Sequence, residues 1–255
     1  MVTIKIDRAR FSVNLIWCPA CNLPSFVRGT IKSREGSICI WCRSNSRQRA
    51  IVSLVRRAAE ILGNEGSIAK VVGISDGQIT EKWAKRKFGG HYKNFHYHQE
   101  PALDLIQVES QNFAIANIVI CSEVLEHVEP PVARAFSGLA KLLAPGGFLV
   151  VSVPYTTSGI AHVEHFEELV DGKLNKFQGG YMWTGKNPEG IEKEYTDLTF
   201  HGGVGTTLEF RVFSEESLQA NLAEAGFSMI KILENQRRSG IVRESWSRVW
   251  LVRKN

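Results

Sequence analysis

Four cysteines near the start of the chain stand in two Cys-x-x-Cys pairs, Cys18 with Cys21 and Cys39 with Cys42. Seventeen residues separate the two pairs. This spacing is typical of a single tetrahedral zinc ion held by four thiolates. Because four thiolates complete the coordination shell, we expect the zinc to stabilise the fold rather than to take part in catalysis. A redox-active dithiol is the alternative interpretation.

The segment that carries these pairs has little else to hold it together. Residues 11–46 are interrupted by Pro, Gly, Ser and Cys and show little apolar periodicity. A unit this small rarely buries enough apolar surface to fold unaided, so a metal is the natural source of its stability. We therefore expect a zinc-binding unit over residues 1–46.

Positive charge is concentrated in the same part of the chain. Residues 1–66 hold eleven Lys and Arg against four Asp and Glu, whereas the whole chain carries a net charge of +5. Such asymmetry is typical of a nucleic-acid partner, and a solvated basic helix face is the other interpretation. The sequence shows neither a long apolar span nor a signal-peptide pattern, so we expect a cytoplasmic protein without a membrane anchor.

Strands and helices alternate through the rest of the chain. Apolar spacing predicts helices over residues 47–62, 79–88, 132–143 and 215–225. Apolar, β-branched runs predict strands over residues 67–72, 91–98, 115–121, 148–153, 227–233 and 247–254. This alternation is typical of an α/β, doubly wound, mostly parallel sheet, here with an antiparallel last strand. The alternation breaks down over about 155–207, which we expect to be an inserted segment close to the site.

One segment carries a family resemblance. Residues 118–154, IVICSEVLEHVEPPVARAFSGLAKLLAPGGFLVVSVP, resemble the strand, loop, helix, turn and strand core of class I S-adenosylmethionine-dependent methyltransferases, in particular those of type 11. Residues 207–232 are similar to the closing helix and strand of that family. The resemblance covers roughly residues 67–255 and implies a Rossmann-like methyltransferase domain, which we place over residues 47–255.

The resemblance implies that S-adenosylmethionine lies against the loop after the first strand, at the switch point of the sheet. In this sequence the loop contains Gly73, Ser75, Asp76 and Gly77, with Ser75 in place of the family's middle glycine. Val71 stands where the family often has an acid. The same Gly-x-Ser-x-Gly pattern also resembles the nucleophile elbow of α/β-hydrolases, in which residues 118–154 would have no role.

The resemblance also implies cofactor contacts from two further loops. Glu100 is the candidate for the ribose hydroxyls, although it is equally typical of a solvated loop acid. Asp104 falls where the family places an acid near the adenine amino group. Ser122 and Glu123 follow the fourth strand and are expected beneath the methionine part of the cofactor. Asn117 replaces an aspartate that is frequent at the start of that strand.

Methyl transfer needs accurate positioning and a deprotonated acceptor more than an elaborate catalytic group. His127 is the first candidate for a general base, and a histidine that only orders the start of a helix is the alternative. His162 and His165 are spaced as on one helical face and could line an acceptor pocket. Tyr155, just beyond the fifth parallel strand, is either an acceptor contact or a pocket wall.

The residues leave three functions open. The first is methyl transfer to a small-molecule or carbohydrate-like acceptor, with the inserted segment as a lid. The second is methylation of ribosomal RNA, with the basic zinc-binding unit holding the nucleic acid. The third is a non-catalytic binding or scaffold module whose cofactor loop has drifted. The oligomeric state is also left open.

Overall fold

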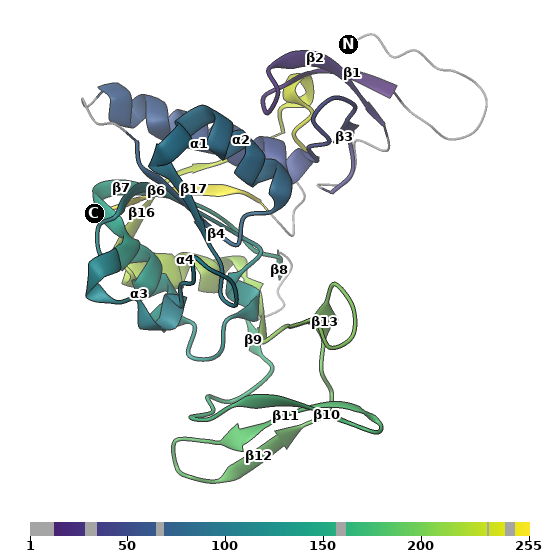
Figure 1. Ribbon diagram of the computed structural model, residues 1–255, viewed down its shortest axis with the longest axis vertical. Coiled ribbons are helices and arrows are strands. Elements are labelled where there is room, and N and C mark those ends of the chain that lie inside the picture. Colours follow the sequence, from purple (N-terminus) through teal and green to yellow (C-terminus); the bar gives the residue numbers. More distant parts are fainter. Residues whose placement is uncertain (1–12, 29–34, 65–68, 157–161, 234, 243–247) are drawn as a thin grey trace, which may run out of the picture.

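The computed structural model describes residues 13–28, 35–64, 69–156, 162–233, 235–242 and 248–255. In Figure 1 a central sheet is layered between helices, with the N-terminal unit at one end and a small antiparallel sheet at the other. No helix among the described ranges is long and apolar enough to cross a membrane.

The central sheet has six strands in the order β16-β17-β7-β6-β4-β5. Strands β4 to β7 run parallel, whereas β17 runs antiparallel to both of its neighbours. The bounds are β4 Val71–Ile74, β5 Tyr92–Phe95, β6 Ala116–Ser122, β7 Leu143–Ser152, β16 Phe227–Ile232 and β17 Trp250–Lys254. The predicted α/β, Rossmann-like sheet with an antiparallel last strand is therefore confirmed.

Two helices cover each face of this sheet (Figure 1). Helices α1 (Ser46–Asn64) and α2 (Gln78–Phe88) pack on one face, and α3 (Ala133–Leu142) and α4 (Glu215–Glu224) pack on the other. Side chains along the strands alternate between the two layers, since Val71 packs in the apolar cluster of α1 and α2 and Val72 in the cluster of α3 and α4. Burial on both faces explains why these strands are continuous apolar runs.

The N-terminal unit is an antiparallel sheet of β1 (Val13–Cys18), β2 (Leu23–Arg28) and β3 (Ile38–Cys39). It packs directly on α1, because Ile16 and Val27 belong to the same apolar cluster as that helix. Polar contacts add to this packing: Arg86 of α2 donates to the Ala20 carbonyl, and Ser46 accepts from the Val242 amide at 2.7 Å. The unit is therefore fastened to the face of the central sheet that α1 and α2 cover, through these two helices and the residues that precede β17.

The region from residue 155 to residue 214, which contains the inserted segment, is built from short strands that pair antiparallel, except where Tyr155–Thr156 runs parallel to Arg211–Ser214. Its elements are β8 Tyr155–Thr156, β9 Val163–Glu164, β10 Lys173–Phe177, β11 Gly180–Lys186, β12 Glu192–Tyr195, β13 Phe200–His201, β14 Thr207–Leu208 and β15 Arg211–Ser214. Strands β10 to β12 form a sheet that projects from the main body (Figure 1). A small aromatic core around Phe166, Trp183 and Phe210 stabilises it.

Two sequence-based expectations need correction here. Residues 162–165 do not form one helical face, because Val163–Glu164 is a strand that pairs with β15. The first parallel strand begins at Val71 rather than at residue 67, and residues 65–68 lie outside the described ranges. Backbone pairing with β5 and β6 fixes that start, and hydrophobicity alone could not locate it.

Candidate active site

The carboxyl ends of β4, β5 and β6 open onto a cavity of about 770 Å³. Strand β4 lies between β5 and β6, so the chain leaves β4 toward one side of the sheet and returns on the other. Ligands of open α/β sheets bind at this kind of switch point. The inserted segment supplies the opposite wall through Leu174, Trp183 and residues near His201. The volume lies within the range of about 300–1,000 Å³ that is usual for small-molecule and cofactor sites.

The loop after β4 is held by β5. Ser75 has a positive φ of 53°, and its amide donates to the Phe95 carbonyl at 2.7 Å. The side chain of Asn94 donates to the Asp76 carbonyl and accepts from the Asp76 amide, at 3.1 and 3.0 Å. The hydroxyl of Tyr92 donates to the Asp76 carboxyl at 2.8 Å. Burial raises the pKa of Asp76 to about 7.

Of the four residues predicted in this loop, only Ser75 lines the cavity. Gly73 is required for packing, because a Cβ there would lie within 2.6 Å of both the Asp76 carboxyl and the Tyr92 hydroxyl. Gly77 precedes α2 and has open space around it. The absence of a side chain at Gly73 therefore leaves room for the Asp76 carboxyl and its hydrogen bond to Tyr92. Gly73 and Asp76 support the loop and do not line the cavity.

The two acids of the next loop are placed differently. Asp104 lines the cavity, and its Oδ1 accepts from the Ile106 amide at 2.9 Å, which caps the short 3₁₀ helix Leu105–Gln107. Glu100 is exposed and accepts from the Ala102 amide at 3.1 Å. The neighbouring Gln99 lines the cavity instead of Glu100.

A chain of hydrogen bonds joins the N-terminal unit to the loop after β6. Arg47 donates to Glu35 at 2.6 Å and to the Ser122 hydroxyl at 2.8 Å. The Ser122 and Ser152 hydroxyls lie 2.8 Å apart, and Ser152 donates to Glu123 at 3.0 Å. Glu123 lines the cavity with a positive φ of 58°, whereas Ser122 faces Arg47. Ser122 therefore positions Glu123 in this structure and lies outside the cavity lining.

His127 follows on the 3₁₀ helix Leu125–His127 and lines the same cavity. Its Nδ1 lies 2.8 Å from the Leu208 carbonyl oxygen, which can only accept, so Nδ1 carries the proton. Burial lowers the pKa of His127, which favours the neutral ring. The free lone pair is therefore on Nε2, which lies 3.8 Å from the Glu126 carboxylate.

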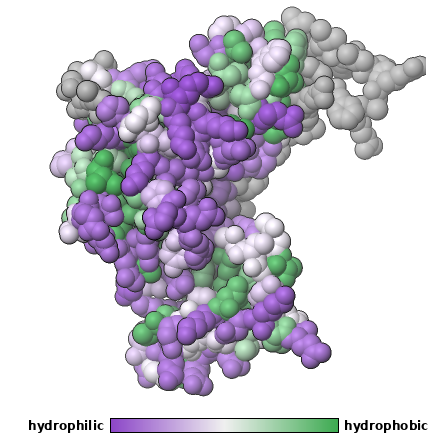
Figure 2. Space-filling view, in the orientation of Figure 1, coloured by the Kyte–Doolittle hydropathy of each residue, from purple (hydrophilic) through white to green (hydrophobic). Residues whose placement is uncertain are grey.

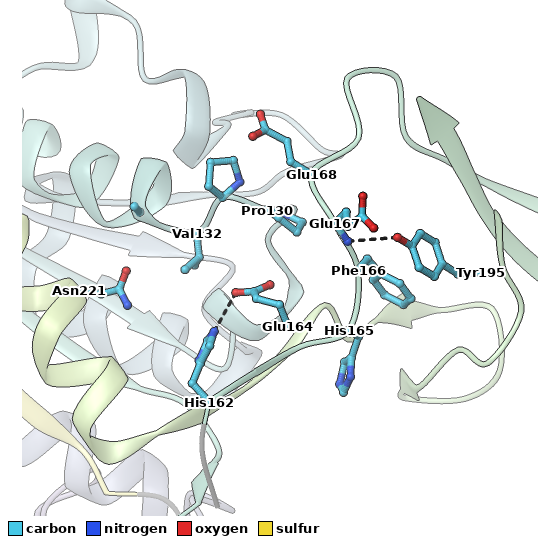
Figure 3. A pocket seen from close by; sticks show the side chains of 12 residues that line it. Pro130, Val132, His162, Glu164, His165, Phe166, Glu167, Glu168, Tyr195 and Asn221 are labelled. Atoms are coloured by element: carbon cyan, nitrogen blue, oxygen red, sulfur yellow. Dashed lines mark hydrogen bonds and ion pairs between the residues drawn. The ribbon is translucent and has the colours of Figure 1, made fainter. Parts of the chain in front are cut away.

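The structure does not bring the other two candidate catalytic residues to this cavity. Tyr155 is buried, and its ring packs edge-on against Trp250 with centroids 6.0 Å apart. His162 lines a second cavity of about 670 Å³, in which it faces Glu164 at 3.0 Å (Figure 3). His165 points the other way in the same view and bonds Glu209 at 3.1 Å.

The sequence placed the inserted segment close to the site but did not identify the residues that this part of the chain contributes. His201, Leu208 and Phe210 reach the cavity from β13, β14 and the residue before β15. The His127 and His201 rings meet edge to face, with centroids 4.7 Å apart. The run His201-Gly202-Gly203 was the available signal, since paired glycines beside a histidine mark a tight turn near a site.

The four cysteines form a compact cluster at the other end of the molecule. The Cys18 and Cys42 sulfurs are 3.7 Å apart, those of Cys21 and Cys39 are 3.9 Å apart, and all four lie within 4.8 Å of one another. A tetrahedron with zinc–sulfur bonds of about 2.3 Å has edges of roughly 3.8 Å, so the donor set fits zinc.

The surroundings of this cluster suit negative charge. Arg49 is buried beside it and donates to the Ser44 and Gly240 carbonyls at 2.5 and 2.6 Å. Burial lowers the pKa of Arg49, and the nearby cysteine sulfurs oppose that shift. A fixed guanidinium beside four thiolates offsets the excess charge that one divalent ion leaves.

Comparison with known proteins gives one family. Residues 33–232 match the sequence profile of a family described as a methyltransferase domain, which is more than half of the chain. No curated protein matches the sequence.

Solved structures of methyltransferases are similar to this chain at low identity. One is an S-adenosylmethionine-dependent methyltransferase from Clostridium acetobutylicum, with 9% identity, a TM-score of 0.48, and 83% of this chain and 93% of that chain covered. Another is the 1,6-didemethyltoxoflavin-N1-methyltransferase of Burkholderia thailandensis, with 16% identity, a TM-score of 0.43 and both chains covered completely. A third is an amino pentose methyltransferase from Micromonospora echinaspora, with 16% identity, a TM-score of 0.46, and 82% and 94% covered.

Proposed function

The chain belongs to the methyltransferase-domain family and is a class I S-adenosylmethionine-dependent methyltransferase, and we propose that it methylates a small-molecule or carbohydrate-like acceptor. The observation that carries this proposal is one cavity in which the loops after β4, β5 and β6 face the inner wall of the inserted segment. Family membership confirms the activity that the sequence resemblance implied. The acceptor class and the residue roles below are the proposal.

Three cavity-lining residues would hold the cofactor. The left-handed turn at Ser75 brings backbone close to the ligand, and the carboxylates of Asp104 and Glu123 offer acceptors on either side of it. Leu105 and Ile106 supply apolar surface beside Asp104, as an adenine ring needs. When bound, S-adenosylmethionine supplies a sulfonium methyl group that is already activated.

The size of the cavity supports a small acceptor. Its volume of about 770 Å³ must contain both the cofactor and the acceptor group. The wall opposite the cofactor loops combines the Trp183 and Phe210 rings with the polar His201 and Thr206. Aromatic faces beside a few polar groups are suited to a carbohydrate-like ring, which is apolar on its faces and polar at its edge.

His127 is the group placed to handle the acceptor proton. Its neutral ring presents Nε2 with a lone pair, beside the Glu123 loop and across from His201. The Leu208 carbonyl fixes the orientation of the ring. The lone pair can accept a proton from an acceptor hydroxyl.

We further propose that residues 1–46 form a zinc-binding unit and that residues 47–255 form the methyltransferase domain, with the insertion over about 155–207. The cysteine cluster supports zinc through its sulfur distances. Because zinc would be enclosed by four thiolates, its role would be to fold this unit and thereby to position Arg47.

A calorimetric titration with S-adenosylmethionine and S-adenosylhomocysteine tests the site. Near-micromolar binding, about −8 kcal/mol, should be weakened at least about tenfold in Asp104→Ala. Glu100→Ala is the matched control, because this acid lies on the same loop but outside the cavity lining. Equal losses in both variants, or no binding by the wild type, would contradict the proposed cofactor site.

The acceptor class is tested by turnover against a panel of hydroxylated small molecules and sugars, with RNA included. Turnover of a small acceptor that is insensitive to salt supports the proposal. Turnover of RNA alone, with a steep loss of binding as salt is added, would overturn the acceptor class in favour of a nucleic acid.

A further inference from the structure

Three side chains that could hold a metal ion converge on the wall of the cavity. Glu126 and His127 come from the 3₁₀ helix after β6, and His201 comes from β13 of the inserted segment. One potential ligand atom from each lies within 4.8 Å of the others. Among the described residues, the cysteine cluster is the other group of this kind. We infer that Glu126, His127 and His201 bind a divalent first-row transition-metal ion.

The His127 ring is oriented as a metal ligand should be. Its Nδ1 proton is donated to the Leu208 carbonyl at 2.8 Å, so Nε2 is deprotonated and directed toward Glu126. The 3.8 Å between Nε2 and the Glu126 oxygen is close to the spacing of two ligands on one ion. Metal–ligand bonds of about 2.0–2.2 Å give ligand separations of roughly 3.0–3.6 Å. A shift of a few tenths of an ångström would complete the contact.

His201 has a carboxylate partner behind it. Its Nε2 lies 2.7 Å from one oxygen of Glu209, whose other oxygen lies 3.1 Å from His165. Histidine ligands commonly give one ring nitrogen to a carboxylate in this way, which fixes the ring and raises its basicity. Glu209 is therefore a positioning residue, and His201 keeps its other ring nitrogen for the ion.

Hydrogen bonds from the residues after β14 hold the backbone that carries Glu126. The Phe210 amide donates to the Glu126 carbonyl at 2.8 Å, and Arg211 donates to the Leu125 carbonyl at 2.5 Å. The positive charge of Arg211 is paired with Glu164 at 2.7 Å. The segment that carries His201 is thus locked onto the segment that carries Glu126, and the ligand set is held together before any ion binds.

Two histidines and one carboxylate are a ligand set with an open position. This combination holds catalytic zinc and non-haem iron, and three protein ligands leave room for water or substrate. The cluster borders the cavity through His127 and His201, so the open position faces the acceptor space. One carboxylate and two neutral rings leave one positive charge on a divalent ion, which an acceptor oxyanion would balance.

The role of the ion rests on the proposed function. An acceptor hydroxyl bound to it would lose its proton to solvent more readily. The resulting oxygen would form a bond to the methyl carbon while the sulfur–carbon bond breaks with its electron pair left on sulfur. The products would be a methyl ether, S-adenosylhomocysteine and the released proton. In this arrangement His127 is a ligand, and the ion takes over the activation of the hydroxyl.

The binding is tested without cofactor or acceptor. Full-length protein with its cysteine site loaded with zinc is titrated with Mn²⁺, which prefers oxygen and nitrogen ligands, and the unbound ion is followed by electron paramagnetic resonance. We expect about one Mn²⁺ per chain. His201→Ala and Glu126→Gln should abolish this binding, and Glu209→Gln should weaken it by about 10-fold to 100-fold. His91→Ala, an exposed histidine on the 3₁₀ helix Gly89–His91, should leave it unchanged.

The outcomes separate cleanly. His201 is partly exposed, so His201→Ala decides the question even if Glu126→Gln fails to fold. No Mn²⁺ binding by the wild type, or equal binding by His201→Ala, would overturn the metal site. Titration of the same His201→Ala protein with S-adenosylhomocysteine keeps the two proposals apart, because the cofactor loops do not depend on this residue.

Discussion

The cysteine cluster and the Glu126, His127 and His201 cluster are two ways of arranging potential metal ligands in one chain. The cysteines come from two short turns, one between β1 and β2 and one directly after β3. They are chemically uniform and would enclose an ion completely. The second cluster brings together a loop of the central sheet and a strand that is distant in the sequence. It combines one carboxylate with two imidazole rings and borders a cavity. A closed set can stabilise a fold, whereas an open set can also reach a substrate.

Loss of the closed cluster has the largest expected effect. Cys39→Ser should release the zinc and unfold the N-terminal unit, because Ile16 and Val27 then lose the sheet that buries them beside α1. We expect the melting temperature to fall by on the order of 10 °C, measured by thermal unfolding together with zinc content. Cys121→Ala, which alters a buried cysteine of β6, is the control and should keep its zinc. Full zinc content in Cys39→Ser would break the comparison.

The open cluster should control turnover instead of stability. His127→Ala removes the Nε2 lone pair from the cavity, so we expect the rate of methyl transfer to fall by about 10²-fold to 10³-fold. The affinity for S-adenosylhomocysteine should change little, since Ser75, Asp104 and Glu123 are intact. The measurement is kcat at saturating cofactor, with His91→Ala as the control. A loss of affinity with kcat retained would place His127 in the cofactor site.

These two clusters also show what the sequence can predict. The cysteine pairs were recognised because each lies within one turn and the metal chemistry depends on that local spacing. The central sheet was recognised because parallel strands buried on both faces are continuous apolar runs, as in residues 115–121.

The second cluster could not be predicted in the same way. His201 reaches His127 only because β13 and β14 pair and the Leu208 carbonyl meets the His127 ring. That contact depends on tertiary packing of a segment whose short strands have no clear periodicity. For His162 the sequence suggested a contact that the structure does not show. Its spacing from His165 suggested one helical face, but the strand β9 between the two residues turns their side chains apart (Figure 3). Asp76 is a similar case. An acid in this loop suggests a ligand contact, but the structure buries its carboxyl against the Tyr92 hydroxyl.

Asp76 lies outside both clusters and is a buried acid whose carboxyl accepts a hydrogen bond from the Tyr92 hydroxyl. Its pKa of about 7 lies above the value near 4 expected in the unfolded chain, so the folded state binds the proton more tightly. The resulting stabilisation is complete below about pH 4 and is lost as the pH rises toward 7. Asp76→Asn should remove roughly 1–3 kcal/mol of pH-dependent stability between pH 5 and pH 8. Chemical denaturation at both pH values measures it, and an unchanged difference would contradict the raised pKa.

Arg47 is the direct link between the two regions and should give the smallest effect. Its guanidinium contacts Glu35 beside the cysteine unit and Ser122 beside the cavity, and Ser152 passes the contact on to Glu123. Arg47→Gln should keep the zinc, because Arg47 does not ligate it, and should weaken S-adenosylhomocysteine binding only a few-fold, about 1 kcal/mol for one lost hydrogen bond. Calorimetry on Arg47→Gln, Cys39→Ser and the double variant measures whether the two losses combine. If loss of the zinc unit acts on the cavity through this residue, the double variant should bind no more weakly than Cys39→Ser alone, whereas fully additive losses would show that the two regions are energetically independent.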